Sequence, residues 1–229
     1  GGHLNVSTAG KGNAGNVTIE ARDQISVDGG GVFSLVEAGA EGNSGNISIT
    51  TGSLFLTNLG QLNASTAGKG NSGNVTIEAR DQISVGGDGV FSLVGPGAEG
   101  NGGNIEIVAD SVFLINGGEL TTNTSGKGNA GNVTIEAREQ ISVDRGGVLS
   151  GVARDGKGNS GNISITTGSL FLTNRGELSA RTGGKGNAGN VTIEAREQIS
   201  VDGRGVFSRV ERDGKGNGGN IEIIAGSVI

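Results

Sequence analysis

The stretch GNAGNVTIE, residues 12–20, decides the fold, because its opening motif G-N-x-G-N recurs along the whole chain. Successive copies are separated by 30 and 28 residues in strict alternation, so two unlike units form a double repeat of 58 residues. A period of this size indicates an architecture in which each repeat is one supersecondary unit. The eight copies begin at Gly12, Gly42, Gly70, Gly100, Gly128, Gly158, Gly186 and Gly216.

Each unit contains three short segments in which apolar and polar residues alternate, separated by Gly, Asn and Asp. This alternation predicts half-buried β-strands. No segment shows an apolar stripe of helical period, and glycine-rich turns interrupt the chain too often for helices. The predicted strands are residues 16–21, 24–27 and 32–36 in the first 30-residue unit, and 46–50, 54–56 and 62–66 in the first 28-residue unit.

Equivalent positions of successive units carry the same type of apolar residue. This is expected if each unit is one coil, because each position then lies over its counterpart at the strand spacing of about 4.8 Å. The sequence therefore predicts an all-β fold, a parallel β-helix of about eight coils with three short strands each. The inward columns are Val17, Ile47, Val75, Ile105, Val133, Ile163, Val191 and Ile221; Ile19, Ile49, Ile77, Ile107, Ile135, Ile165, Ile193 and Ile223; Val32, Val90, Val148 and Val206; and Val36, Val94, Val152 and Val210.

The repeat covers residues 1–229, which we interpret as a single array of four double repeats. Residues 1–4 match residues 117–120, and Ile229 matches Phe113, so the chain starts and stops within a coil. We therefore expect a piece of a longer array, whose two open strand edges favour end-to-end stacking of copies.

The composition narrows the classes of function. The chain has 48 glycines, six Phe, one His and no Cys. Without cysteine, neither a disulfide nor a thiolate metal site forms, and His3 alone leaves little for histidine-based catalysis. Apolar runs of only a few residues predict no membrane insertion. The net charge of −6 argues against nucleic acid as a partner, because phosphates are bound by basic surfaces.

The second asparagine of each G-N-x-G-N motif forms one column in the stacked arrangement. Stacked side-chain amides can hydrogen-bond from coil to coil, so this column predicts a structural asparagine ladder, with a sugar-binding row as the alternative. The flanking glycines allow positive φ at this corner. The ladder residues are Asn16, Asn46, Asn74, Asn104, Asn132, Asn162, Asn190 and Asn220.

The phenylalanines form two rows on strands whose neighbouring positions are predicted to point inward. Exposed apolar rows can mark a contact surface, and the alternative is that the rings pack beneath neighbouring turns. The rows are Phe33, Phe91 and Phe207 in the 30-residue units, and Phe55, Phe113 and Phe171 in the 28-residue units.

The charged columns give no prediction of a catalytic or metal site. Glu20 and Arg22 recur every 58 residues, which is typical of a solvated face with weak Glu–Arg pairing. A hydrolase needs one unique pair of carboxylates in a cleft, rather than four equivalent copies. The turn at residues 28–31, DGGG, offers too few oxygen ligands for calcium. We therefore predict no enzyme activity, no metal and no cofactor.

Units such as residues 12–22, GNAGNVTIEAR, followed by residues 24–27, QISV, resemble the repeats of filamentous-haemagglutinin-type exoproteins, in particular those of large cyanobacterial members. The resemblance covers the whole chain. It implies a right-handed parallel β-helix, in agreement with the usual hand of parallel crossovers. It also implies two-partner secretion through an outer-membrane partner, an extracellular or cell-surface location, and a role in adhesion or surface coating.

The most direct functional interpretation is the structural or adhesive shaft of a secreted bacterial exoprotein, since a solenoid is stiff and lengthens by duplication. Its partners would be cell-surface glycans or other copies of the chain. One alternative is a lateral-assembly module that forms fibres or a sheath through the phenylalanine rows. Another is a polysaccharide-active β-helix enzyme, although the units differ by only two residues and leave no long loop to build a groove.

Overall fold

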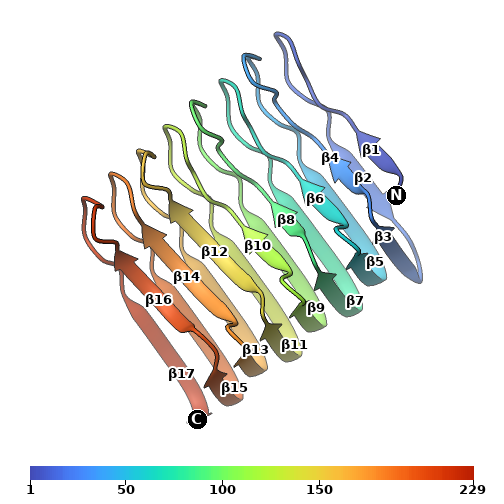
Figure 1. The fold of residues 1–229 in the computed structure, drawn as a ribbon. Coiled ribbons are helices and arrows are strands. Elements are labelled where there is room, and N and C mark those ends of the chain that lie inside the picture. The colour runs from blue at the N-terminus through green and yellow to red at the C-terminus, as the bar shows by residue number, and fades with distance from the viewer.

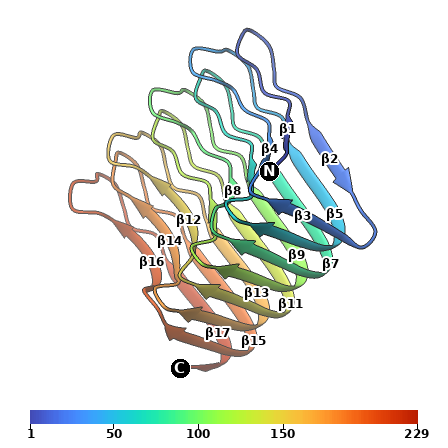
Figure 2. The same ribbon diagram turned by 45° about the vertical axis from the view of Figure 1, so that its right-hand side comes forward.

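Repeats that stack place like residues in hydrogen-bonded columns, and the computed structural model, which describes all 229 residues, has this arrangement (Figure 1). It is a parallel β-solenoid of about eight coils without any helix, as predicted. The coils follow one another along a single axis, with the two termini at opposite ends of the stack (Figures 1 and 2).

Two parallel sheets run the length of the stack, one of short strands and one of long strands. The short sheet contains β1 (His3–Asn5), β4 (Gly31–Phe33), β6 (Gln61–Asn63), β8 (Gly89–Phe91), β10 (Glu119–Thr121), β12 (Gly147–Val152), β14 (Glu177–Thr182) and β16 (Gly205–Val210). The long sheet contains β2 (Val17–Glu20), β3 (Gln24–Asp28), β5 (Ile47–Thr57), β7 (Val75–Gly86), β9 (Ile105–Ile115), β11 (Val133–Asp144), β13 (Ile163–Thr173), β15 (Val191–Asp202) and β17 (Ile221–Val228).

The prediction of three separate strands per coil is wrong at one corner. From the second coil onward, the first two predicted segments form one continuous bent strand, and only β2 and β3 remain separate. The reason is that hydrogen bonding between coils continues through the bend, where the Ser53 N–H donates to the Asp23 carbonyl at 2.9 Å. The 30-residue units carry one more residue here than the 28-residue units, and the register shifts between Ala137 and Gln140 to accommodate it.

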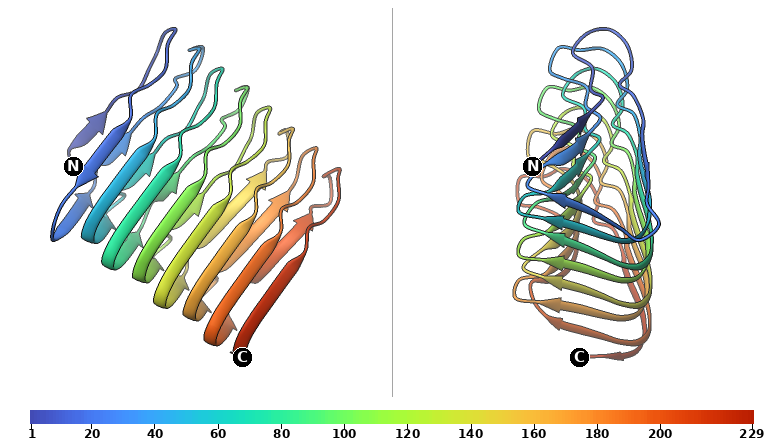
Figure 3. Two further views of the ribbon diagram at one scale, coloured as in Figure 1. Left: turned by 180° about the vertical axis from the view of Figure 1, so that it is seen from behind. Right: turned by 90° about the vertical axis from the view of Figure 1, so that its right-hand side faces the viewer.

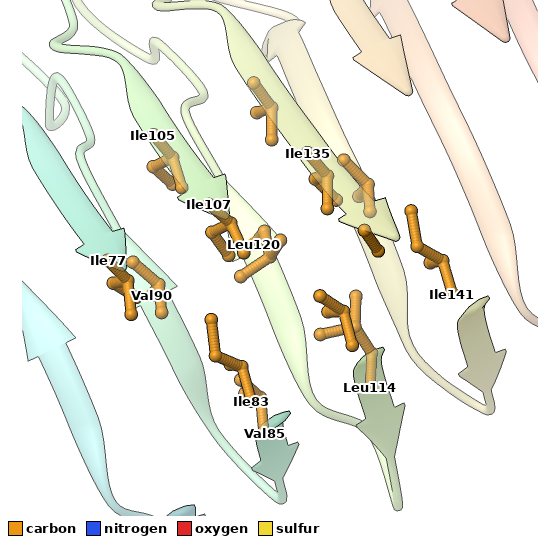
Figure 4. Close-up of a cluster of buried hydrophobic side chains, with 14 of the residues drawn as sticks. Ile77, Ile83, Val85, Val90, Ile105, Ile107, Leu114, Leu120, Ile135 and Ile141 are labelled. Atoms are coloured by element: carbon orange, nitrogen blue, oxygen red, sulfur yellow. The ribbon is translucent and has the colours of Figure 1, made fainter. Parts of the chain in front are cut away.

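The predicted inward columns form the core, except at the ends of the stack. Ile77, Ile107 and Ile135 are almost fully buried and lie in register above one another. Their side chains meet those of the opposite sheet, among them Leu120 (Figure 4). Ile221 and Ile223 in the final strand remain 44% and 40% exposed, because no further coil covers them.

Serine side chains brace the interior on the side of the G-N-x-G-N motifs. The side chain of Ser92, fully buried, donates a hydrogen bond to the Gly73 carbonyl at 2.8 Å and accepts one from the Gly103 N–H at 2.9 Å. Ser34 and Ser150 make the same pair of bonds in their own coils. Ser92 thereby ties the end of β8 to the two arcs that lead into β7 and β9. Figure 3 shows how these arcs stack along one side of the molecule.

Candidate functional site

The asparagine column at the second position of the motif is hydrogen-bonded in every coil. The Asn46 N–H donates to Asn16 Oδ1 at 2.8 Å, and the same bond recurs at each step up to the donation from the Asn220 N–H to Asn190 Oδ1 at 2.8 Å. The donor is therefore the backbone of the next coil, rather than the side-chain amide that the sequence suggested. The side chain acts as an acceptor that completes the stacking of the corner.

A second ladder, which the sequence analysis missed, is formed by the first asparagine of each motif. Asn43 donates from its backbone to Asn13 Oδ1 at 2.8 Å, and seven such bonds link all eight residues. The signal was present, since this asparagine is repeated as strictly as the other one. The column is Asn13, Asn43, Asn71, Asn101, Asn129, Asn159, Asn187 and Asn217.

The two glycines of the motif are required for different reasons. Gly42 has a φ of 148°, in a region that side chains disfavour, and this agrees with the expected positive φ at the corner. Gly45 has no such φ, but a Cβ there would lie 2.1 Å from the Gly15 carbonyl oxygen. The glycines thus let the arcs of successive coils approach closely enough for the ladders to form.

The structure places all six phenylalanines on the outer faces of the sheets, each partly buried. Phe55 lies between the fully buried Leu54 and Leu56, so alternation directs its ring outward. No phenylalanine stacks on another. On the long sheet the column runs Ser26, Phe55, Ser84, Phe113, Ser142, Phe171 and Ser200. On the short sheet it runs Asn5, Phe33, Asn63, Phe91, Thr121, Leu149, Ser179 and Phe207.

Neighbouring residues cover part of the short-sheet rings. A Cβ on Gly31 would lie 2.5 Å from the ring of Phe33, so this glycine makes room for the ring. The His3 ring lies 5.5 Å from that of Phe33, and the Arg209 guanidinium lies 4.8 Å above the ring of Phe207. The phenylalanine rows are therefore interrupted ridges with partial cover, rather than continuous apolar strips.

The sequence analysis expected the arginines at the bend of the long strands to pair with the glutamates two residues before them. The structure shows no such pair. Arg80 Nη2 instead donates to the Arg22 carbonyl at 2.7 Å, two coils away. Its guanidinium passes over Gly52, where a Cβ would lie only 2.7 Å from Nη2. Arg138 and Arg196 reach back in the same way, and Arg138 also pairs with Asp110. These arginines therefore link the bends of coils that are two apart in the stack.

Carboxylates gather on the outer face of the short sheet. Burial raises the pKa of Glu119 above its usual value, and it raises the pKa of Asp88 as well. Glu177, two strands further on, lies 3.4 Å from Arg204 Nη1. By contrast, hydrogen bonds from Asn58 and Thr57 lower the pKa of Asp28 at the turn before β4. Asp28, Asp88 and Glu177 are thus contacted by side chains of neighbouring coils, whereas Glu119 accepts a hydrogen bond from Thr121 in its own strand.

The comparisons with known proteins give no relative: no family model, no curated protein and no solved structure matches the chain. The structure contains no helix of the length and apolarity needed to cross a membrane. It also contains no group of three or more His, Cys, Asp or Glu side chains placed to hold a metal ion.

Proposed function

We propose that this chain is the stiff shaft of a secreted, surface-attached bacterial protein. A β-solenoid is compatible with such a structural role, because each coil contacts only its neighbours and length is added one coil at a time. The observation that carries the proposal is the unbroken hydrogen bonding between coils. It runs through the long sheet, the short sheet and both asparagine ladders, so that no face of the stack is free to hinge.

The secreted location and the adhesive role are the finer parts of this proposal. They are supported by the resemblance of units such as residues 12–22 to filamentous-haemagglutinin-type repeats. An outer-membrane secretion partner follows from the same resemblance, and the ligands would be cell-surface glycans or further copies of the chain.

Small-angle X-ray scattering of tandem chains tests the shaft. Joining two copies in register, with the three residues needed to complete the interrupted coil, adds about eight coils at about 4.8 Å each. We expect the stack to lengthen by about 38 Å, with a cross-section radius of gyration unchanged from that of the single chain. A tandem chain that lengthens by much less would show that the stack bends or separates between coils, which is incompatible with a stiff shaft.

We further propose that the chain performs no catalysis. The carboxylates with a raised pKa, Glu119 on the outer face of the short sheet and Asp88 in the turn before β8, lie on the outside of the stack, whereas general acids and bases act within clefts that hold a substrate. Incubation with soluble polysaccharides should therefore release no reducing ends. Release by the chain that is lost in Glu119→Gln would overturn this proposal.

Lateral assembly is the second candidate, and one apolar feature favours it. Leu35, Leu93, Ala38 and Ala67 line a shallow hollow of roughly 490 Å³ beside the short sheet. Phe33 and Phe91 lie two residues before these leucines and on the same outer side of their strands. A convex partner of matching shape could fill the hollow and bury the adjacent rings.

Sedimentation velocity over a range of concentrations separates the two candidates. An assembly module should form larger species as concentration rises, and Leu35→Ser with Leu93→Ser should abolish them. The control is Leu59→Ser, which removes a more exposed leucine, 66% accessible, outside the hollow. In a shaft without lateral contacts, larger species arise only by end-to-end stacking, so the distribution of species should be the same in all three proteins.

A further inference from the structure

One outward column, just before the G-N-x-G-N motifs, carries a charged residue in every coil. Successive members form parallel β-bridges, so their backbones are separated by one strand spacing, about 4.8 Å. The column reads Lys11, Glu41, Lys69, Glu99, Lys127, Lys157, Lys185 and Lys215.

In the first half of the stack, the positive and negative charges of this column balance one another. Lys11 Nζ lies 3.6 Å from Glu41, and Lys69 Nζ lies 3.7 Å from the same carboxylate. Lys127 Nζ lies 2.5 Å from Glu99 Oε1, and this contact lowers the pKa of the glutamate. Alternation of Lys and Glu thus gives each charge an opposite neighbour along the stack.

In the second half the alternation stops. Lys127, Lys157, Lys185 and Lys215, which we call the lysine row, are consecutive and exposed. Lys157, Lys185 and Lys215 have no carboxylate within 4.0 Å. The backbones of adjacent lysines are one strand spacing apart, about 4.8 Å, which is less than the Debye length of about 8 Å at physiological salt, so neighbouring charges repel one another unless an anion lies between them.

The charges around the lysine row do not cancel it. Asp213 lies 3.0 Å from Arg154, and Glu211 lies 3.5 Å from Arg181, so these two carboxylates are already paired with arginines. Asp155 is the one nearby acid without such a partner, and Arg212 adds a further cation. The asymmetry extends to the whole chain: residues 1–115 carry 4 Lys or Arg and 11 Asp or Glu, whereas residues 116–229 carry 13 and 12.

Amide groups accompany the lysine row. Asn159, Asn187 and Asn217 follow Lys157, Lys185 and Lys215 by two residues and are exposed. Their Oδ1 atoms are used within the ladder where a following coil exists, but none of their Nδ2 groups donates a hydrogen bond within the chain. The lysine row is therefore flanked by donors that suit neutral oxygens such as sugar hydroxyls.

We propose that the lysine row binds a linear acidic polysaccharide that carries one carboxylate per sugar, extended along the axis of the stack. The row offers one cation per step of about 4.8 Å, comparable to the length of one sugar ring, with amide donors beside each cation. A heavily sulfated chain has more than one charge per sugar, and a row with one cation per sugar would leave part of them unmatched. Single-stranded nucleic acid is disfavoured, because its bases need exposed aromatic platforms and this column contains only Lys and Glu.

The residues found elsewhere in the same column suggest the variants that test binding to the lysine row. Lys157→Glu with Lys215→Glu restores the alternation already present at Glu41 and Glu99, so these coils acquire a pattern that the fold accommodates. The reverse change, Glu41→Lys with Glu99→Lys, extends the lysine row over all eight coils. The control, Arg22→Glu with Arg175→Glu, gives the same change in net charge at side chains that form no ion pair and lie outside the column.

Binding of the full chain to immobilised polygalacturonate is measured by interferometry between 25 and 200 mM salt. We expect Lys157→Glu with Lys215→Glu to weaken binding by about tenfold or more and to reduce the salt slope by about half or more, because two of the three lysines without a carboxylate partner are lost. Glu41→Lys with Glu99→Lys should strengthen binding, and the control should bind within about threefold of the parent chain.

Four results would overturn the proposal. The first is that the parent chain fails to bind polygalacturonate while remaining folded by circular dichroism. The second is that the control loses as much affinity as Lys157→Glu with Lys215→Glu, which would indicate a response to net charge alone. The third is that heparin or single-stranded DNA binds more tightly than polygalacturonate at equal salt. The fourth is that neutral dextran binds equally well.

Discussion

Replacing Ser92 by alanine tests whether the serine brace holds the two sides of a coil together. The Ser92 side chain is fully buried and makes two hydrogen bonds, to the Gly73 carbonyl at 2.8 Å and from the Gly103 N–H at 2.9 Å. Alanine retains the Cβ and fits this interior column, because Ala64 and Ala180 occupy it in other coils and are also fully buried. The change therefore isolates the hydroxyl.

The expected loss of stability depends on whether the two backbone groups can find other hydrogen-bond partners. A hydrogen bond contributes about 1 kcal/mol net, and a buried group left without a partner costs about 1–3 kcal/mol. Neither the Gly103 N–H nor the Gly73 carbonyl has another partner within the chain. We therefore expect Ser92→Ala to lower the free energy of unfolding by about 2–4 kcal/mol.

Two measurements check this value. The chain has no Trp or Tyr, so urea unfolding is followed by far-ultraviolet circular dichroism. Amide exchange by NMR should show the Gly103 N–H losing a factor of about 30 to 1,000 in protection, the equivalent of that free energy at about 1.4 kcal/mol per decade. Ser92→Thr should recover most of the stability, because Thr122 already donates from this interior column to the Gly131 carbonyl at 2.6 Å.

Ser84→Ala is the matched control, since Ser84 lies on the outer face of β7 and its side chain forms no hydrogen bond. It should change stability by less than about 0.5 kcal/mol. If Ser92→Ala were as mild as Ser84→Ala, the brace would not stabilise the coil and the reasoning would be refuted.

Three further predictions concern other parts of the stack. Ile107→Ala empties a site that is 1% exposed and should cost about 3 kcal/mol in urea unfolding. Leu59→Gly should raise stability by about 0.5–1 kcal/mol, because Leu59 has a φ of 68° and Gly117 occupies the same turn position in the next 28-residue unit. Glu119→Gln should stabilise the chain at pH 7. Burial raises the pKa of Glu119 in the folded state, so the ionised carboxylate opposes folding at pH values above the ordinary carboxyl pKa. The gain in stability from Glu119→Gln should therefore fade as the pH is lowered.

Each of these has an outcome that would contradict it. A loss below about 1 kcal/mol for Ile107→Ala would mean that the column is not closely packed. A loss of stability in Leu59→Gly would mean that the leucine makes a contact that outweighs its backbone strain. Equal stability changes at pH 4 and pH 7 for Glu119→Gln would mean that ionisation of this carboxyl is not linked to folding.

The inward columns were predictable because alternation and repetition act together. Ile19 and its equivalents are apolar in all eight units, and a one-residue slip would turn the whole set outward. The bend at Gly52 was harder to interpret, since a glycine between two alternating segments is typical of a turn that ends a strand. Hydrogen bonding between coils continues past it, because each strand is held by its neighbours on both sides rather than by local preference.

The side-chain contacts at the surface were less predictable. The bond from Arg80 to the Arg22 carbonyl joins residues 58 apart and depends on a glycine in the intervening coil. The lysine row was missed for a different reason: unlike Glu20 and Arg22, its members do not repeat every 58 residues, since Glu41 and Glu99 stand where Lys157 and Lys215 follow. The net charge of −6 conceals this order along the stack.

The ladders also say how such a chain folds. Asn43 bonds to Asn13 across 30 residues, and Asn71 bonds to Asn43 across 28, so the ladder bonds of a coil need only the coil next to it. The entropic cost of closing a loop rises only with loop length, so every coil added to the stack meets the same cost as the one before it. We therefore expect the folding time per coil to be independent of the total length of the array. We expect structure to spread from a formed coil to the next, with each coil serving as the template for its successor.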